Sequence, residues 1–397
     1  MQKQFNKSFT QQEALPEAGI AAATQLMRSG RLHRYNTEGE ALSAAAELEQ
    51  AFADWQGRQY CLACTSCGYA LQIGLRAMGV QPGEAVLTNG YTLAPVPGAI
   101  VNVGARPVLV EVEDHYHLDL ADLRLKAQAS GARVLVLSYM RGHIPNMTSL
   151  MQLCDDLGLQ VLEDCAHTMG AAWQGQRSGN FGVMAAFSLQ TYKHINTGEG
   201  GLLVSDDKQM MARAIMHSGS YMLYERHGAA PEVETFADIR YTSANMSGRM
   251  DNLRAALALS QLPLLETNCQ RWNKRYDLLF QQLSQVPGLY LPPRHKHEQY
   301  VGSSIQFMAR GLSVAQLPAF VAACGERGVE LKWFGEREPR AFTSRYDSWR
   351  FIAPQHLPNT LSVLEKTLDM RVPLTFELED CQLLAEIIAE VCGEFVR

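Results

Sequence analysis

A single lysine, Lys193, stands within the segment Phe187–Gly201, after Ser188 and shortly before the glycine-rich run Gly198–Gly201. Upstream, an apolar run ends in a carboxylate, Asp164. A lysine amine that forms a Schiff base, with a carboxylate that keeps a pyridine nitrogen protonated, is the residue pair that pyridoxal 5'-phosphate (PLP) chemistry uses. The pattern therefore predicts PLP chemistry, with Lys193 as Schiff-base residue and proton carrier and Asp164 as partner of the ring nitrogen.

A phosphate site is predicted at Ser66, Cys67 and Gly68, where a short polar turn joins a strand to a helix. Backbone N–H groups at the start of a helix bind phosphate, and the Ser188 hydroxyl can add to the same site. Many strand–helix turns bind no ligand, so the prediction of a phosphate site here depends on Lys193 and Asp164 as further evidence for PLP.

Other residues have a functional and a structural interpretation. His167 is a candidate hydrogen-bond donor to the phenolic oxygen of PLP, or an ordinary structural histidine. Tyr91 either stacks on the pyridine ring or packs within its loop. Arg249 stands at the start of a helix. It either binds a phosphate, in its own subunit or in a neighbouring one, or is a solvated arginine. Asp164 itself is the type of residue that caps helices, whereas Glu163 should point to the opposite face of its strand.

Cys61, Cys64 and Cys67 have a C-x2-C-x2-C spacing that resembles iron–sulfur ligation. A fourth nearby cysteine and the trailing Cys-Pro are missing, and residues 60–64 read as a buried strand. We therefore expect buried thiols and no metal site.

The elements that position these residues alternate between short apolar strands and helical stretches. We expect strands at 60–64, 85–88, 108–112, 134–138, 160–162, 202–205, 301–308 and 329–334, and helices at 41–55, 69–78, 118–129, 147–157, 208–216, 250–283, 314–327 and 377–395. This alternation predicts a mostly parallel sheet with helices on both faces and ligands at the carboxyl ends of its strands. We divide the chain into an N-terminal segment (1–40) that packs on the fold, a large PLP-binding domain (41–275) and a smaller C-terminal α/β domain (276–397).

Composition restricts the possible functions. The chain has 397 residues, 47% of them hydrophobic, and a net charge of −6. Nucleic-acid binding needs a basic face, so nucleic acid is not an expected partner. The absence of an apolar span or signal core predicts no membrane partner and a cytoplasmic location, where the nine cysteines remain free thiols.

Together these residues resemble the DegT/DnrJ/StrS-type aminotransferases, often called sugar aminotransferases, of PLP fold type I. The likeness runs from about residue 30 to the end. The similar segments are Thr65–Leu71, Gly83–Val86, Val103–Val108, Leu162–His167, Phe187–Gly201, Arg249–Ala256 and Met370–Leu374.

The resemblance implies a homodimer with active sites shared between subunits, an amino donor that is usually glutamate, and a keto-sugar nucleotide or keto-cyclitol as acceptor. It assigns cofactor contacts to Cys67, Gly68, Asp164, His167, Ser188 and Lys193, and it places Arg249 toward the partner's site. Cys67 and Gly68 replace a more usual Gly-Thr pair. Leu93 stands where an aromatic residue often covers the ring, so that Tyr91 is the alternative.

We therefore expect an aminotransferase that carries an amino group from an amino acid, L-glutamate in the first instance, to a keto-sugar or keto-cyclitol. Two alternatives are a PLP-dependent sugar dehydratase or deoxygenase of the same fold, and a non-catalytic regulator. Some of the former carry histidine at the position of Lys193, and a regulator has no need for Lys193 and Asp164 together.

Overall fold

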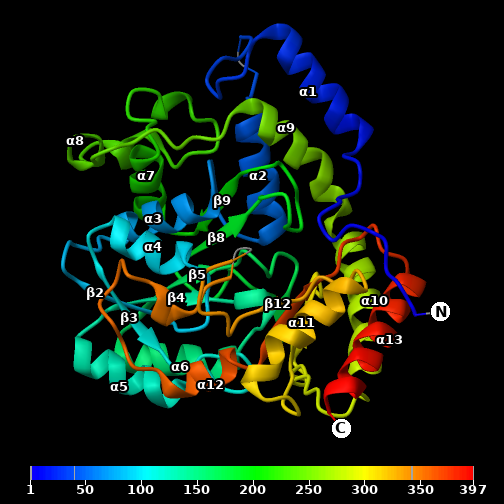
Figure 1. Ribbon diagram of the computed structural model, residues 1–397. Coiled ribbons are helices and arrows are strands. Elements are labelled where there is room, and N and C mark those ends of the chain that lie inside the picture. The colour runs from blue at the N-terminus through cyan, green and yellow to red at the C-terminus, as the bar shows by residue number, and fades with distance from the viewer. Residues whose placement is uncertain (1, 40, 341–342, 397) are drawn as a thin grey trace.

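The computed structural model describes residues 2–39, 41–340 and 343–396. Its centre is a seven-stranded sheet, near the middle of Figure 1, in which β8, β5, β4, β2 and β3 are parallel neighbours. β9 runs antiparallel to both β1 and β8. The strand order is β1 (Tyr60–Cys64), β9 (Gly201–Ser205), β8 (Met184–Ser188), β5 (Gln160–Asp164), β4 (Val134–Ser138), β2 (Ala85–Asn89) and β3 (Arg106–Val110). The expected mostly parallel sheet is confirmed.

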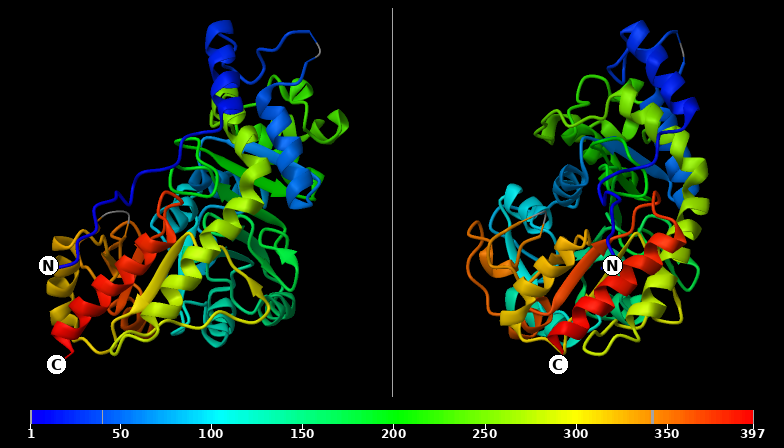
Figure 2. Two further views of the ribbon diagram at one scale, coloured as in Figure 1. Left: turned by 90° about the vertical axis from the view of Figure 1, so that its right-hand side faces the viewer. Right: turned by 45° about the vertical axis from the view of Figure 1, so that its right-hand side comes forward.

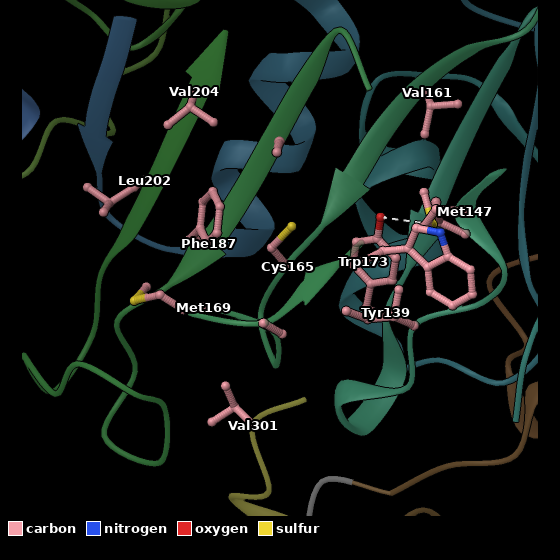
Figure 3. Packing of buried hydrophobic residues seen from close by; sticks show 14 of the residues in the cluster. Tyr139, Met147, Val161, Cys165, Met169, Trp173, Phe187, Leu202, Val204 and Val301 are labelled. Atoms are coloured by element: carbon pink, nitrogen blue, oxygen red, sulfur yellow. Dashed lines mark hydrogen bonds between the residues drawn. The ribbon is translucent and has the colours of Figure 1, made fainter. Parts of the chain in front are cut away.

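Helices cover both faces of this sheet because successive strand residues point to opposite sides. One face packs on α2 (Ala44–Gln56), α5 (Leu120–Ser130), α6 (Met147–Leu157) and α9 (Asn252–Gln261). The other face packs on α3 (Cys67–Ala77), α4 (Pro95–Asn102) and α7 (Lys208–His217). Figure 3 shows part of the first of these clusters, including Phe187, Cys165 and Tyr139.

Cys61 and Cys64 belong to opposite faces of β1 because they are three residues apart on a strand. All three are free thiols; Cys61 and Cys64 are buried as expected, whereas Cys67, at the start of α3, is half-buried.

A second α/β unit contains the antiparallel sheet β11–β13–β12, formed by β11 (Ser304–Met308), β13 (Thr367–Arg371) and β12 (Lys332–Trp333). Its apolar face packs on α11 (Leu317–Glu326), α13 (Leu378–Phe395) and the second half of α10 (Leu265–Leu283). The long helix α10 thus joins the two units, as Figure 2 shows. The proposed boundary at residues 275/276 lies within this helix, and the three-part division remains a proposal.

The expected strand 329–334 is shortened to Lys332–Trp333. In the described chain β12 pairs only with β13, and it ends two residues before Gly335.

Smaller elements are β6 (Ala172–Trp173), β7 (Gln176–Arg177), β10 (Glu298–Gln299), α1 (Glu17–Ser29), α8 (Ile239–Thr242) and α12 (Pro358–Leu364). α1 lies against α9, and the Phe5 N–H upstream of it donates to Arg327 O at 2.9 Å. Within the described ranges, none of the helices is both long and apolar enough to cross a membrane.

Gly201, at the start of β9, lies directly against the turn that precedes α3. A Cβ atom there would lie 2.3 Å from the Ser66 carbonyl carbon and 2.6 Å from the Cys67 nitrogen. We expect Gly201→Ala to destabilise the fold by about 2 kcal/mol or more, because backbone has to move. The measurement is the urea midpoint of unfolding. Gly98→Ala is the control, since nothing lies within 4 Å of that position in α4; equal midpoints for the two variants would contradict the prediction.

Candidate active site

The candidate active site is a cavity of about 320 Å³ at the carboxyl ends of the large sheet's strands. It brings together most of the residues that were predicted from sequence to bind a cofactor. Those that line it are Ser66, Cys67, Gly68, Leu93, Asp164, His167, Ser188 and Lys193.

One end of the cavity is formed by the first turn of α3. The Ser66 side chain caps the helix by accepting a hydrogen bond from the Tyr69 N–H at 3.1 Å. The first N–H groups of a helix have no partner inside it, and they carry partial positive charge. Cys67 and Gly68, which begin α3 and line the cavity, therefore form a site for an anion such as a phosphate.

Asp164 is held at the end of β5, on the sheet face that α3 covers. Its carboxylate accepts hydrogen bonds from the Ser138 hydroxyl at 2.8 Å and the Ala166 N–H at 3.2 Å. The Cys67 thiol lies 3.7 Å from the same carboxylate. Burial raises the pKa of Asp164, and the hydrogen bond from Ser138 opposes that shift. A buried carboxylate with so few donors is able to pair with a cationic N–H group of a ligand.

The neighbouring carboxylate, Glu163, points to the opposite face, as the strand alternation predicts. It is fully buried and accepts a hydrogen bond from the Tyr139 hydroxyl at 2.6 Å. The N–H groups of Gly179, Phe181 and Gly182 also donate to it. Glu163 therefore fixes the loop that leads into β8 and is not available to a ligand.

The Lys193 amine reaches into the cavity, where Nζ lies 2.9 Å from Nε2 of His167. Burial lowers the pKa of Lys193 to about 7, and the positive charge of Arg141 adds to the shift. Burial and the Lys193 charge also hold the pKa of His167 well below its usual value. At neutral pH a large share of Lys193 is therefore unprotonated, the state in which an amine acts as a nucleophile or general base.

This depressed pKa has a consequence for stability. The unfolded chain binds a proton on Lys193 up to pH about 10.5, and the folded chain only up to about 7. The folded state therefore carries the cost of a buried charge below pH 7, and that cost disappears as the pH rises from 7 to 10.5. We expect cofactor-free Lys193→Met to melt a few degrees above the parent protein at pH 6 and close to it at pH 10. Melting curves that coincide at both pH values would contradict this.

Two predicted residues lie outside the cavity lining. Tyr91 is buried, with its ring 5.1 Å from that of Phe334 and 5.5 Å from that of Tyr116, so it packs in a hydrophobic cluster and does not face the cavity. Leu93 takes the place that faces it. The Arg249 guanidinium donates to Gly219 O and to Ser247 Oγ and does not line the cavity of its own chain.

Several residues in or next to the cavity were not predicted from sequence. Ser138, the last residue of β4, lies behind the lining, donates to Asp164 and accepts a hydrogen bond from the lining residue Thr92 at 2.7 Å. A polar residue at or just after the end of a buried strand is the sequence signal that would have found both. Arg141 and Arg371 also line the cavity, although β13, which carries Arg371, belongs to the second sheet.

The cavity thus combines a helix N-terminus for a phosphate, a buried carboxylate for a cationic ring nitrogen and a near-neutral amine for an aldehyde. This set of groups fits PLP, and each group comes from a different strand end of the same sheet. No described group of three or more His, Cys, Asp or Glu residues is placed to hold a metal ion.

Comparison with known proteins gives a consistent result. The chain is 29% identical over 256 residues to the spore coat polysaccharide biosynthesis protein SpsC of Bacillus subtilis, covering 63% of this chain and 64% of that protein. It is 31% identical over 261 residues to GDP-perosamine synthase of Caulobacter vibrioides, covering 64% and 67%. These matches therefore span about two thirds of each relative.

Solved structures resemble the fold over nearly the full length. A 3-amino-5-hydroxybenzoic acid synthase superimposes with a TM-score of 0.84 at 22% identity, covering 99% of this chain and 100% of that one. The sugar aminotransferase CalS13 of Micromonospora echinospora gives 0.80 at 21% identity, covering 96% and 98%. The model of the DegT/DnrJ/EryC1/StrS aminotransferase family matches residues 14–389. The chain therefore belongs to the DegT/DnrJ/EryC1/StrS aminotransferase family.

Proposed function

We propose that this protein is a PLP-dependent aminotransferase that transfers an amino group from an amino acid to a keto-sugar or a keto-cyclitol. The proposed donor is L-glutamate, and the proposed keto-sugar is nucleotide-linked. The observation that supports this most directly is that Lys193 shares one cavity with Asp164 and the N-terminus of α3, and that burial lowers the pKa of its amine to about 7. Bound PLP supplies an electron sink that makes the carbon–hydrogen bond beside the nitrogen acidic.

In this proposal each residue has one task. Lys193 is the covalent attachment point and moves the proton at the substrate carbon that bears the nitrogen. Asp164 keeps the ring nitrogen protonated. The N–H groups of Cys67 and Gly68 and the Ser188 hydroxyl hold the phosphate, and His167 serves the phenolic oxygen. Leu93 covers the ring from the side of β2.

Named relatives support the substrate class. One matched protein is a GDP-perosamine synthase, and another, 30% identical over 244 residues, is a UDP-2-acetamido-2-deoxy-3-oxo-D-glucuronate aminotransferase of Pseudomonas aeruginosa. The structural neighbour Spr1654 of Streptococcus pneumoniae has a PLP form and a PMP form. We take a nucleotide-linked keto-sugar as the first acceptor to test, and a cytoplasmic location as part of the proposal.

We further propose a homodimer in which Arg249 completes the partner's site. Large apolar side chains are exposed on α1 and on the segment before Arg249; they are Ile20, Met27, Tyr221, Met222, Tyr241 and Met246. Sedimentation measures the mass in solution. Mixing Lys193→Ala with Arg249→Ala subunits should restore activity in hybrid dimers if each site takes one residue from each chain.

The first test is the visible spectrum of the purified protein with added PLP. We expect an absorption band that disappears on addition of L-glutamate and returns with an active keto acceptor. An absorption band that does not change on addition of L-glutamate would indicate another amino donor or the dehydratase alternative. A protein that gives no band with PLP would be the non-catalytic regulator instead.

A further inference from the structure

The small sheet turns a charged face toward the active site. In an antiparallel sheet, residues directly opposite each other share a face. Asp369 of β13 lies opposite Gln306 of β11 and Lys332 of β12, and Arg371 follows two residues after Asp369. The alternate residues, such as Leu368 and Met370, belong to the apolar core on the other side.

Arg141, from the large domain, completes this group. Its guanidinium forms an ion pair with Asp369 at 3.0 Å, and its side chain is 7% exposed. The backbone of Arg141 is in the left-handed region, with φ of 55°, which costs free energy in a residue other than glycine. The fold therefore holds this arginine against the cavity at some cost.

The positive charge of this group exceeds its negative charge. Asp369 is the one carboxylate described in this group: it pairs with Arg141, accepts a hydrogen bond from Gln306 at 2.7 Å, and acts on Lys332 and Arg371 only through its charge. In the described chain neither Lys332 nor Arg371 forms an ion pair, and the buried Lys332 Nζ has no hydrogen-bond partner. Arg371 instead lies over the Tyr192 ring, 3.8 Å from its centroid. A buried ammonium without a partner is costly, and Arg371, half-buried in the cavity wall, likewise lacks a carboxylate partner among the described residues, so the arrangement favours an anionic ligand.

The phosphate of PLP does not account for this charge, because its predicted site is the N-terminus of α3. Arg141 and Arg371 line the same cavity as Lys193, so an anion that they bind lies near the reacting atoms. A nucleotide diphosphate is several bonds away from the keto carbon of its sugar. A carboxylate attached within one or two bonds of the reacting carbon is the group that fits, and it matches the planar fork of an arginine.

We propose that Arg141 and Arg371, which line the cavity, form a carboxylate subsite with Lys332 beside them on the same face of the small sheet, and that the keto acceptor, like the amino-acid donor, carries a carboxylate close to its carbonyl carbon. The inference rests on the proposed aminotransferase function and narrows its acceptor. Donor and acceptor occupy the same cavity in turn. The donor carboxylate pairs with these cations in the first half-reaction. An uncharged keto-sugar would leave them without an anionic partner in the second half-reaction, whereas a 4-oxo-uronate, with its carboxylate two bonds from the keto carbon, or a carboxylated cyclitol would pair with them.

Binding of a non-reacting carboxylate tests the subsite independently of catalysis. Glutarate, which has neither an amino nor a keto group, is titrated calorimetrically into the full-length protein with and without PLP. We expect Arg371→Gln and Lys332→Met each to weaken glutarate binding about tenfold or more. Arg310→Gln is the matched control, because Arg310 lies in the same small domain but is 44% exposed and pairs with Asp114. Equal affinities in all four proteins would overturn the subsite.

Measuring the two half-reactions separately shows whether the subsite binds the carboxylate of the donor, of the acceptor or of both. The PLP form is mixed with L-glutamate, and the pyridoxamine form with a 4-oxo-uronate nucleotide or its uncharged 4-oxo-sugar counterpart. We expect the carboxylated acceptor to react at least about tenfold faster in kcat/KM, and Arg371→Gln to remove the difference. Equal rates for the two acceptors, or an effect of Arg371→Gln on glutamate alone, would overturn the acceptor assignment. Failure of the aminotransferase proposal is distinguishable, because then glutarate binds but glutamate leaves the visible band unchanged.

Discussion

Lys193→Ala is expected to lower the rate of the proposed aminotransfer about 10⁴-fold or more, and to remove the visible absorption band of the PLP-treated protein. The variant loses both the attachment point and the group that moves the proton at the substrate carbon. Proton transfer by a positioned side chain alone contributes about 10²–10⁴-fold, and the nucleophile adds to it. Single-turnover rates with L-glutamate and absorption spectra measure the two losses separately.

Two controls make this result specific to the amine. Lys274→Ala removes an exposed lysine of α10 and should leave both readouts unchanged. A small primary amine added to Lys193→Ala should restore part of the proton-transfer rate, since it replaces the missing base. A Lys193→Ala variant that retains most of the parent rate would show that another residue carries the proton, and would remove the central support for the proposed function.

Local patterns were sufficient for much of the large domain. The strands Tyr60–Cys64 and Val134–Ser138 and the helix Met147–Leu157 have the same bounds in the structure as in the sequence-based prediction. Each is bounded by its own signals. The helix at 147–157, for example, begins after Asn146, whose side chain accepts a hydrogen bond from the Ser149 N–H, and ends at Gly158 in the left-handed conformation.

Other elements depend on partners that are distant in sequence. β8, Met184–Ser188, was not predicted as a strand, because its alanine-rich sequence has little strand preference and its pairing with β5 and β9 fixes it. The helix Glu17–Ser29 was also not predicted, although Pro16 before it and Gly30 after it are typical helix boundaries.

The same distinction applies to the site. Asp164 was found because it ends an apolar strand pattern, and Lys193 because it stands between Ser188 and the glycine-rich run Gly198–Gly201. Arg371 and Lys332 come together with Arg141 only through the register of the small sheet and its contact with the large domain. No local pattern encodes that contact. For Tyr91 the sequence left two interpretations open, stacking on the pyridine ring or packing within the protein, and the packing of its ring against Phe334 favours the second.

Asp164→Asn is expected to lower the proposed aminotransfer at least about 10²-fold while leaving the protein as stable as the parent near neutral pH. An amide does not hold a proton on the ring nitrogen, so the electrostatic support for the electron sink is lost. Burial raises the pKa of Asp164, which means that the ionised carboxylate costs folding free energy at pH values above that pKa. The neutral amide avoids this cost and still accepts the Ser138 hydrogen bond. Rates with L-glutamate and urea unfolding measure the two effects.

The adjacent carboxylate is the matched control, because Glu163→Gln should have the opposite consequences. Glu163 accepts hydrogen bonds from one hydroxyl and three N–H groups, and the NH₂ of glutamine would face donors at one of its two positions. Bonds to a charged group are worth about 1.5–3 kcal/mol each, so we expect a loss of about 3 kcal/mol in unfolding free energy. The folded variant should keep its glutamate half-reaction, since Glu163 does not face the cavity. One residue step along a strand reverses the face on which a side chain lies, so the two carboxylates should affect different properties. If both substitutions impaired the same property, the assignment of Asp164 to chemistry and Glu163 to structure would be wrong.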